Sequence, residues 1–597
     1  MNLERFVPSR RVLIAGGVLL ALFIVLPWLI EPLAASRLRA MLHERGLDGR
    51  WHKLSVSWPL VVELRGLTVD RASDATRMVS AKRVQVALGA RGLSWKPRIS
   101  SVVLEDAHFT LASHVSEEDS IETADDAPKG GPAAPRVRAA AQQLADALLL
   151  PARRLPELRL RDIEVQRGDS LFARLDALTL THHAGGLQFA AAGSLNGDRP
   201  VPFDAALQWQ RDDRLTGRAS FRVPQGERGS VPLAFTIDGR VSQDRRARVL
   251  RVAQGTHMSI GQADMRISGE VAAKGPRFQL ALEVDQLTAR AVQRSLPRAV
   301  LGPLADLDVK GSWDWRASLD VNVAAPDSTR FTADVIPHGL QLGQSDAQLR
   351  LGRLSGPFLA EIHVPRGIVY RELSDANPNY RPIDRISTLL RYGLLTNEDG
   401  GFYRHRGFNT EAIQLAMAAN LRAGSFKRGA GTITMQLVRN LFLGHQRTLS
   451  RKGQEVVLAW VIEHLTGLSK DRLLEIYLNI IEWGPGVHGA SEASRFYFDK
   501  SPDDLTLDEA LFLVVLVPSP SRWRSRVDAH GELRPWARAQ MAFIARKMAE
   551  HGWLAPEAVP DAMSFRVQLR GAAAQVFAPA DSSAAHEPEP GRESVHF

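Results

Sequence analysis

The sequence predicts a protein of several domains, with an N-terminal transmembrane helix, a β-rich middle region and a C-terminal all-α lobe. Three observations favour this fold class. An uncharged apolar run lies near the start of the chain, the apolar residues of the middle region recur at every second position, and those of the last third recur about every 3.6 positions. The chain has 597 residues, more than one hydrophobic core can serve, so about three to four domains are expected.

The first predicted element is Val12–Ile30, a run without a charged side chain that nearly spans a hydrocarbon core of about 30 Å as a helix. Three arginines precede it: Arg5, Arg10 and Arg11. The positive-inside rule then puts residues 1–11 in the cytoplasm and the bulk of the chain on the other side of a single-pass membrane anchor. The alternative is a cleaved signal peptide, whose apolar region is usually about 7–15 residues long.

The second element is the β-rich region at 51–365, where apolar and polar residues alternate as in half-buried strands. A pattern of two alternate apolar positions, a two-residue gap and two more recurs three times: Val62, Leu64, Leu67, Val69; Val102, Leu104, Ala107, Phe109; and Leu158, Leu160, Ile163, Val165. Such a phase slip predicts a β-bulge or tight bend within a long antiparallel sheet. The region resembles the AsmA-like β-rich periplasmic domains of bacterial envelope proteins.

Two segments are predicted to be disordered from their composition. The first, 116–136, is acidic and then rich in Gly, Pro and Ala; a helix is expected directly after it, at Val137–Leu150. The second is the tail at 572–597, which is rich in Ala, Pro, Ser and charged residues.

The third element is a helical lobe at 383–552, because the apolar period changes near Pro382. The expected helices are Glu411–Arg422, Arg447–Leu465, Lys470–Ile481 and Leu507–Val517. Within the second of them, Val456–Ile462 is apolar all round, which predicts burial on every side.

The first candidate functional block is Asn397–Asn409, where Glu398 and Asp399 stand shortly before His405 among glycines and aromatic residues. Adjacent carboxylates of this kind suit a cleft in which one of them transfers a proton. The structural alternative is an acidic turn or a helix N-cap.

The second block is Arg428–Asn440, where a loop of Gly and Ala precedes Thr432 and Thr434 at an expected helix start. Free backbone N–H groups at such a start favour an anion, and Lys427 adds positive charge. The alternative is an ordinary capped helix after a flexible loop.

The third block places Arg447, Arg451 and Glu455 four residues apart, on one face of a helix. The alternative is a surface ion pair worth only a few tenths of a kcal/mol. Because the helix continues as an apolar run, we expect Glu455 and Glu398 to be the two carboxylates of one cleft. A fourth block, Lys470–Asn479, is best explained as a structural helix followed by a turn.

Together and in this order the blocks resemble glycosyltransferase family 51, most of all its monofunctional biosynthetic peptidoglycan transglycosylases. The family motifs are matched at Glu398, Asp399, Phe402, His405 and Gly407; at Gly429, Thr432, Ile433, Thr434, Gln436, Leu437 and Asn440; at Arg451, Lys452 and Glu455; and at Lys470, Leu474, Glu475, Tyr477, Leu478 and Asn479. A fifth motif, usually two arginines, is represented by Arg538 alone. The chain departs from the family pattern at Ala430, Gly431, Met435, Arg439 and Ala539.

The resemblance implies an all-α, lysozyme-like glycosyltransferase lobe that polymerises lipid II into β-1,4 glycan strands and releases undecaprenyl diphosphate. It implies that Glu398 is the general base and that Glu455 orients the diphosphate site, a role compatible with Mg²⁺ or Mn²⁺, although no residue is assigned as a metal ligand. His405 is expected to be a positioning residue. The implied substrate-binding residues are Asp399, Lys427, Thr432, Thr434, Gln436, Arg439, Asn440, Arg447, Arg451 and Lys452.

The implied location is the bacterial inner membrane with the bulk of the chain in the periplasm, and the implied partners are lipid II, the growing glycan strand and the membrane, with no nucleic acid. The S-x-x-K and K-T-G marks of a transpeptidase do not occur, so cross-linking would need a separate transpeptidase. Two other functions stay open: a lytic, glycan-cleaving enzyme, and a non-catalytic envelope protein that binds lipid or acts as a scaffold.

Overall fold

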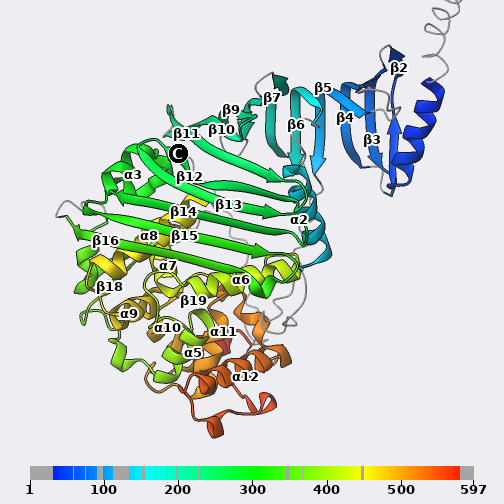
Figure 1. Ribbon diagram of the computed structural model, residues 1–597. Helices are drawn as coiled ribbons and strands as arrows, with labels where there is room; N and C mark the ends of the chain where they lie inside the picture. The colour runs from blue at the N-terminus through cyan, green and yellow to red at the C-terminus, as the bar shows by residue number, and fades with distance from the viewer. Residues whose placement is uncertain are drawn as a thin grey trace, which may run out of the picture. The chain divides into compact units, whose positions relative to one another are not determined.

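The structure is a computed structural model, and it describes residues 31–57, 60–73, 76–89, 98–111, 133–149, 155–167, 170–183, 186–195, 200–225, 229–343, 349–365, 367–444 and 449–577 (Figure 1). The predicted cytoplasmic N-terminus and the transmembrane helix at 12–30 lie outside these residues. None of the helices within the described ranges is both long and apolar enough to cross a membrane.

The chain forms two compact units. The first is made of residues 1–305, 309–341 and 410–429, and the second of residues 306–308, 342–409 and 430–597. The first unit therefore contains most of the β-rich region, and the second contains most of the helical lobe. The short segment 410–429 belongs to the sheet unit although it lies within the predicted lobe.

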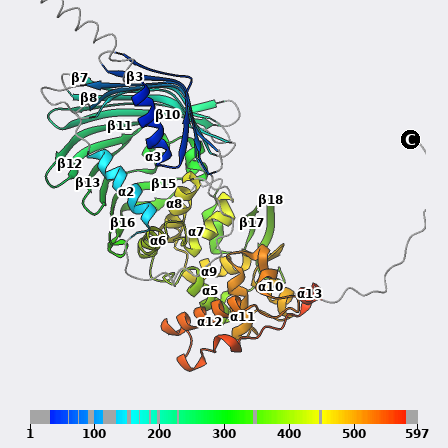
Figure 2. The same cartoon turned by 90° about the vertical axis from the view of Figure 1, so that its right-hand side faces the viewer.

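The first unit is dominated by one 16-stranded sheet whose strands follow one another in chain order, with β2 as a side branch on β3. Figure 2 shows them as one continuous, curved layer. The strands are β1 (Leu47–Arg50), β2 (Lys53–Ser57), β3 (Val61–Arg71), β4 (Arg77–Gly89), β5 (Arg98–Leu111), β6 (Glu157–Arg167), β7 (Ser170–His183), β8 (Gly186–Leu195), β9 (Val201–Gln210), β10 (Arg214–Gln225), β11 (Gly229–Asp244), β12 (Val249–Ile260), β13 (Ala263–Ala272), β14 (Arg277–Leu287), β15 (Val309–Asn322) and β16 (Arg330–Leu342).

Neighbouring strands are antiparallel wherever their register is defined, except β5 and β6, which are parallel. Parallel strands need a long crossover, and the connection from β5 to β6 contains the helix α2 (Pro135–Leu148). The expected helix is thus confirmed but begins inside the segment predicted to be disordered, because Pro135 is a favourable first helical residue. Residues 116–132 of that segment lie outside the described residues.

The predicted phase slip is confirmed at all three repeats as a tight bend and not as a bulge, because the pairing register continues unchanged across each gap. Each two-residue gap contains a residue with positive φ: Gly66 at 63°, Asp106 at 52° and Asp162 at 51°. Left-handed backbone at these positions turns the strand, so that the apolar residues on both sides of the gap face the same way. Aspartate tolerates this conformation better than most residues, which explains why only one of the three positions needs glycine.

The consequence of these bends is a small core on one face of the sheet. Three buried side chains form its centre, and partly buried apolar residues pack around them: Ala81, Ala107 and Ile163 with Leu67, Val84, Leu104, Phe109, Leu160 and Leu175. Charged side chains from β3 to β7 line a cavity of about 620 Å³. The remaining short helices of the unit are α3 (Ala289–Ser295), α4 (Arg298–Leu301), η2 (Gly302–Asp306) and η3 (Pro326–Ser328).

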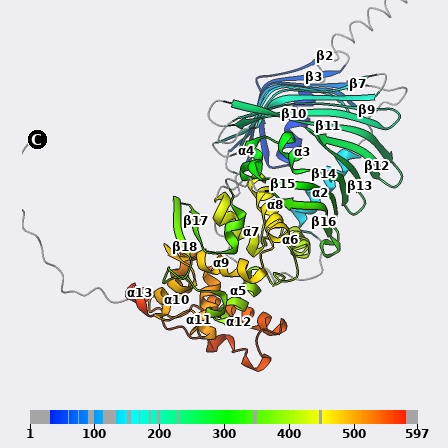
Figure 3. The ribbon, with the colours of Figure 1, turned by 90° about the vertical axis from the view of Figure 1, so that its left-hand side faces the viewer.

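The second unit is mainly helical (Figure 3). Its helices are α5 (Thr388–Glu398), α7 (Ile433–Val438), the π-helix η6 (Arg439–Leu443), α8 (Leu449–Leu465), α9 (Lys470–Ile480), α10 (Ala490–Phe498), α11 (Leu507–Leu516), α12 (Pro535–Glu550) and α13 (Gly571–Gln575), with the short turns η4 (Leu351–Ser355), η5 (Ile383–Arg385), η7 (Pro520–Arg526), η8 (Pro556–Ala558) and η9 (Ala562–Ser564). Two hairpins complete it: β17 (Phe358–Val364) with β18 (Gly367–Leu373), and β19 (Glu482–Gly484) with β20 (Val487–His488).

The core of this unit lies around α11, which packs against α5 and α12 and is buried along almost its whole length.

The four expected helices are present as α6 (Thr410–Ala423, in the first unit), α8, α9 and α11, with ends that differ by one or two residues. The prediction that Val456–Ile462 is buried all round is wrong at Val457, which is 44% exposed. The tail prediction is also wrong at its start, since α13 packs on α10 and Arg570 donates its backbone N–H to Tyr497 at 2.7 Å. Residues 578–597 lie outside the described part of the chain.

Candidate active site

Glu398 is the last residue of α5, and its carboxylate is held by two neutral amides. Gln436 Nε2 donates to Glu398 Oε2 at 2.9 Å, and Asn397 Nδ2 donates to Oε1 at 2.8 Å. Close packing of protein atoms around the partly exposed side chain raises the pKa of Glu398, while these hydrogen bonds and the charge of Arg439 act in the opposite direction. A carboxylate with a raised pKa and an accessible edge suits a general base.

Gln436 is itself oriented by Tyr477 of α9. The Tyr477 hydroxyl donates to Gln436 Oε1 at 2.9 Å, which leaves the amide nitrogen to face Glu398. Tyr477 is fully buried, and burial followed by the charge of Glu398 raises its pKa well above the usual value, so the hydroxyl stays a donor. The sequence singled out Tyr477 only as part of a motif; its link to Glu398 needed the packing of α9 against α7.

Asp399 joins the first and second blocks. Its carboxylate lies 2.9 and 3.0 Å from His405 Nε2 and accepts the backbone N–H of Ile433, the first residue of α7, at 3.1 Å. The Asp399 side chain is 3% exposed and that of His405 is 10% exposed. In this structure His405 pairs with Asp399, and Asp399 bonds to the start of α7; the predicted contact of Asp399 with substrate stays a prediction.

Thr432 is the N-cap of α7: its hydroxyl accepts the N–H of Met435 and donates to the carbonyl of Gly407 at 2.7 Å. Gly407 has φ +85°, and a Cβ there would lie 2.7 Å from the Cα of Trp460, so only glycine brings the two blocks this close. Thr432 is almost fully buried, and its predicted contact with substrate is replaced by these structural bonds.

Thr434 is also fully buried and donates to Glu463, which pairs with Lys470 Nζ at 2.7 Å. Lys470 in turn lies over the ring of Phe402, 4.2 Å from its centroid. Burial lowers the pKa of Lys470, and the pairing with Glu463 opposes that shift. Thr434 therefore belongs to a structural network behind α7, although the sequence predicted that it binds substrate.

Glu455 on α8 lies in a cationic environment. Arg451 Nη1 bonds to its Oε1, and Lys452 Nζ lies 3.0 Å from its Oε2. Glu455 is 2% exposed, whereas the Lys452 side chain is 52% exposed. The surface-pair alternative for Arg451 and Glu455 is therefore excluded by burial.

The positive charge of Arg439 acts on Glu398 and on Lys452, the lysine that pairs with Glu455. Arg439 is the first residue of the π-helix η6, a form that often marks functional sites. Burial first, and then Arg439 and Arg451, lower the pKa of Lys452, so each arginine lies close enough to repel this lysine. Arg439 also acts on Glu398, and its buried Nε has no hydrogen-bond partner among the described residues. Such a cluster is suited to a polyanion such as a diphosphate.

A divalent cation does not fit this donor set. Both oxygens of Glu455 are already taken by cationic side chains, which a metal ion would have to displace. Within the described ranges there is no group of three His, Asp or Glu residues that could hold a metal. The role of Mg²⁺ or Mn²⁺ that the sequence left open has no ligands here.

Other predicted site residues lie elsewhere or are not described. Arg447 is outside the described residues, and Lys427 belongs to the sheet unit. Asn440 follows Arg439 in η6 and is half-buried. Arg538, the remnant of the fifth motif, lies 3.9 Å from Glu532 and lines a separate cavity of about 460 Å³.

Glu475 and Asn479 of the fourth block hold the segment before α5 in place. Glu475 accepts from the Tyr380 hydroxyl at 2.7 Å and from the backbone N–H of Ile383 at 2.9 Å, and Asn479 exchanges two hydrogen bonds with the backbone of Arg381. These bonds fix the segment that leads into α5 and Glu398.

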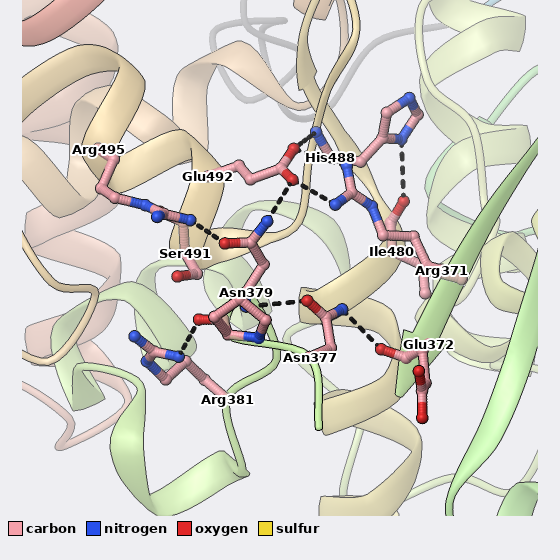
Figure 4. Close-up of polar contacts among 11 residues, drawn as sticks. Arg371, Glu372, Asn377, Asn379, Arg381, Ile480, His488, Ser491, Glu492 and Arg495 are labelled. Atoms are coloured by element: carbon pink, nitrogen blue, oxygen red, sulfur yellow. Dashed lines mark hydrogen bonds and ion pairs between the residues drawn. The ribbon is translucent and has the colours of Figure 1, made fainter. Parts of the chain in front are cut away.

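A second polar network reinforces the same segment (Figure 4). Glu492 of α10 binds the guanidinium of Arg371 from β18 and accepts from Asn379 Nδ2 at 2.8 Å, while Arg495 donates to the other end of the Asn379 side chain. His488 completes it, with its backbone N–H directed at Glu492. The network ties β18 and the start of the lobe to α10, and it does not touch the candidate site.

Comparison with known proteins identifies the lobe. Residues 366–549 match the family model described as Transglycosylase. Relatives named biosynthetic peptidoglycan transglycosylase are 46% identical over 142 residues in Thiobacillus denitrificans, 40% over 167 residues in Paraburkholderia xenovorans and 37% over 188 residues in Alcanivorax borkumensis. These matches cover 24%, 28% and 30% of this chain and 60%, 67% and 76% of the respective relatives. Since two of these relatives are covered over two thirds or more of their length, the chain belongs to the transglycosylase family, glycosyltransferase family 51.

Proposed function

We propose that the protein is a peptidoglycan glycosyltransferase that polymerises lipid II into β-1,4 glycan strands. One observation carries the proposal: Glu398 has a raised pKa, is oriented by Gln436 and Tyr477, and shares Arg439 with the cations around Glu455. This arrangement offers a base next to a polyanion site, which is what transfer of a sugar from a diphosphate requires.

In the proposed reaction Glu398 takes the proton of the 4-hydroxyl on the acceptor's N-acetylglucosamine. The oxygen forms a bond to C1 of the donor's N-acetylmuramic acid while the bond from C1 to the diphosphate oxygen breaks. The configuration at C1 inverts from α to β, and undecaprenyl diphosphate leaves with the bonding electron pair. The proton ends on Glu398 and then passes to solvent.

Negative charge grows on the leaving diphosphate, and Arg439, Arg451 and Lys452 are the groups proposed to meet it. Preorganised donors of this kind are each worth about 10²–10³ in rate. Glu455 then has the role of a clamp, because its carboxylate holds Arg451 and Lys452 in place for the diphosphate. Asn440 and Gln436 are the proposed hydrogen-bond partners of the substrate.

The proposed location is the bacterial inner membrane, with Val12–Ile30 as a single-pass anchor and the bulk of the chain in the periplasm. A polyprenyl substrate stays in the bilayer, so an anchored polymerase meets it there. The absence of transpeptidase motifs from the sequence supports a polymerase without cross-linking activity, which would work beside a separate transpeptidase.

The two other functions are less well supported. A lytic enzyme cleaves a glycosidic bond and has no use for three cations beside its acid. A non-catalytic protein was suggested by the altered second motif, but Met435 is 3% exposed and faces the core, so it removes no side chain from the cleft. Gly431 has an ordinary φ and lies near Lys452, where its missing side chain leaves room rather than a clash.

The test is glycan-chain formation from purified lipid II by the full-length protein in detergent or liposomes. We expect polymer from the wild type and a loss of about 10³-fold in kcat for Glu398→Gln, which keeps the shape but not the base. Glu550→Gln, on the exposed end of α12, is the matched control and should keep full activity. An inactive wild type, or equal polymer from wild type and Glu398→Gln, would refute the proposal.

A further inference from the structure

The π-helix η6, whose first residue is Arg439, packs against the hairpin strand β17. Both elements belong to the same compact unit. Within η6 the backbone N–H of Gly444 donates to the carbonyl of Arg439 at 2.9 Å. A single helical turn gains little from its own hydrogen bonds, because most of its residues are fixed for few bonds in return. The neighbours of η6 therefore decide where Arg439 lies.

One face of β17 is apolar and buried. Phe358, Ala360 and Ile362 alternate along the strand and are each less than a tenth exposed, and Leu441 of η6 is buried as well. At the end of η6, Gly444 has φ +73°, and a Cβ there would lie 3.8 Å from the Cβ of His363 in β17. The strand thus contacts the end of η6 closely.

Arg353 joins the two elements. It lies in η4, directly before β17. Its guanidinium carbon is 5.6 Å from the ring centroid of Phe358 in β17 and 5.9 Å from that of Phe442 in η6. Both distances fall within the limit of about 6 Å for attraction between a cation and an aromatic face. The Nε of Arg353 is buried without a hydrogen-bond partner among the described residues, so the two rings are what this part of the guanidinium meets.

The η4 turn is itself held by Arg472 of α9. Nε of Arg472 donates to the carbonyl of Leu354 at 2.9 Å, and its Nη2 donates to the carbonyl of Gly356 at 2.6 Å. Arg472 also pairs with Glu475 on the same helix, and its side chain is 17% exposed. Arg353 therefore extends from a turn that is anchored to the helical lobe.

The place of η6 affects both parts of the candidate site. The charge of Arg439 lowers the pKa of Glu398 and that of Lys452. Of the two charged groups that act on Glu398, Arg439 and Asp399, only Arg439 lies on η6. A shift of η6 would move one cation of the site and change the charge near the base.

The elements that hold η6 precede the recognised family segment. Residues 351–364, which form η4 and β17, come before residue 366, where the match to the family model begins. The family comparison therefore assigns no role to Arg353.

We propose that Arg353 is a positioning residue of the transferase, which holds η6 against β17 so that Arg439 meets the leaving diphosphate. The identity of that leaving group rests on the proposed function. Arg353 acts through Phe442 and does not itself touch the substrate. Loss of Arg353 lets η6 shift, which weakens the stabilisation of the growing negative charge while Glu398 keeps its amide partners.

The experiment compares the wild type with Arg353→Met and Arg353→Lys in the full-length protein. Methionine keeps an unbranched side chain without the charge, and lysine keeps the charge without the planar guanidinium. The control is Arg524→Met, the same substitution at an arginine whose guanidinium carbon lies 5.8 Å from the ring centroid of Trp523.

Two measurements are made on each variant. Lipid II polymerisation over a range of pH gives kcat, KM and the acid limb of kcat/KM. Hydrogen exchange followed by mass spectrometry reports the order of residues 439–444 without any need for activity. Exchange in α11, the core helix, shows whether the lobe stays folded.

We expect Arg353→Met to lower kcat about tenfold and to raise KM less than about threefold, because the charge on the diphosphate grows in the transition state. The acid limb should move to higher pH, since Arg439 then acts less on Glu398. Exchange at 439–444 should become faster while α11 is unchanged. Arg353→Lys should keep most of the activity, and Arg524→Met should change none of these readouts.

Unchanged exchange at 439–444 in Arg353→Met would overturn the inference, as would an equal loss of kcat in Arg524→Met. Faster exchange with kcat and the acid limb unchanged would also overturn it, and so would faster exchange in α11, which would mean that the whole lobe has loosened. If the wild type makes no polymer, but exchange at 439–444 rises in Arg353→Met and not in Arg353→Lys, the proposed function fails while the holding of η6 by Arg353 stands.

Discussion

Glu398 and Glu455 lie in the same lobe, but neutral side chains bind the first and cationic side chains bind the second. Neutral amides from Gln436 and Asn397 hold Glu398, and close packing raises its pKa. Arg451 and Lys452 bind both oxygens of Glu455. Arg439 lies near enough to act on Glu398 and on Lys452.

The difference separates two chemical tasks. A carboxylate held by neutral donors in a crowded site, with its pKa raised, is suited to accept a proton and release it again. A carboxylate that bonds two cationic side chains keeps those cations in place. The comparison therefore assigns proton transfer to the first region and charge organisation to the second, and the following changes test that division.

The largest effect is expected for Glu455→Gln. It leaves Arg451, whose side chain is 15% exposed, without its counter-charge, and should lower the free energy of unfolding by about 3 kcal/mol. Urea unfolding followed by circular dichroism measures this.

The double variant Arg451→Met with Glu455→Met removes both charges and should recover most of that stability, while polymerisation stays low. If activity returns together with stability, the second region has only a structural role and the division is wrong.

A smaller effect is expected for Gln436→Leu, which removes the amide that donates to Glu398. That hydrogen bond lowers the pKa of Glu398, so its loss raises the pKa further. The base works only when deprotonated, so activity is lost as pH falls through the raised pKa. The acid limb of kcat/KM should therefore move to higher pH.

Tyr477→Phe should have a weaker effect of the same kind as Gln436→Leu, because it removes only the hydroxyl that orients Gln436. Its acid limb should lie between those of the wild type and Gln436→Leu. An acid limb that does not move in either variant would mean that another group limits the rate at low pH.

The smallest effect is expected for Gly431→Ser, which restores the family residue beside Lys452. Gly431 has no positive φ, and a Cβ there would make only an ordinary contact of 3.8 Å with Lys452 Nζ. We expect kcat/KM to change by less than about twofold.

Gly407→Ala, in contrast to Gly431→Ser, should not be tolerated. The φ of Gly407 is +85°, and a Cβ there would collide with the backbone of Trp460. This substitution should destabilise the lobe and abolish polymerisation. Equal tolerance of both changes would show that the junction of the first two blocks is looser than the structure indicates.

Much of the fold could be predicted because its signals are local. The two-residue gaps in the alternating pattern predicted a bulge or a tight bend, and the structure has left-handed bends at Gly66, Asp106 and Asp162 with the strand register unchanged. The helices α6, α8, α9 and α11 follow from the 3.6-residue period. The start of α2 and the presence of α13 were missed, because composition alone does not reveal the contacts that order a short segment.

The site was predicted in part. The blocks that carry Glu398 and Glu455 were found from their residue types and order. The structural hydrogen bonds of Thr432 and Thr434 were not predicted. A threonine at a helix start gives the same sequence pattern whether its hydroxyl faces a ligand or caps the helix. The link between Tyr477 and Gln436, 41 residues apart, likewise depends on how two helices pack.

The sequence by itself determined which region is rich in strands and which is helical, where three of the strands bend, and the family to which the lobe belongs, because these depend on residue order along the chain. Only the tertiary structure decided that Asp399 organises α7, that Glu455 is clamped by two cations, and that α6 belongs with the sheet. The physical reason is that hydrogen bonds and ion pairs between distant residues form only after packing has brought their elements together.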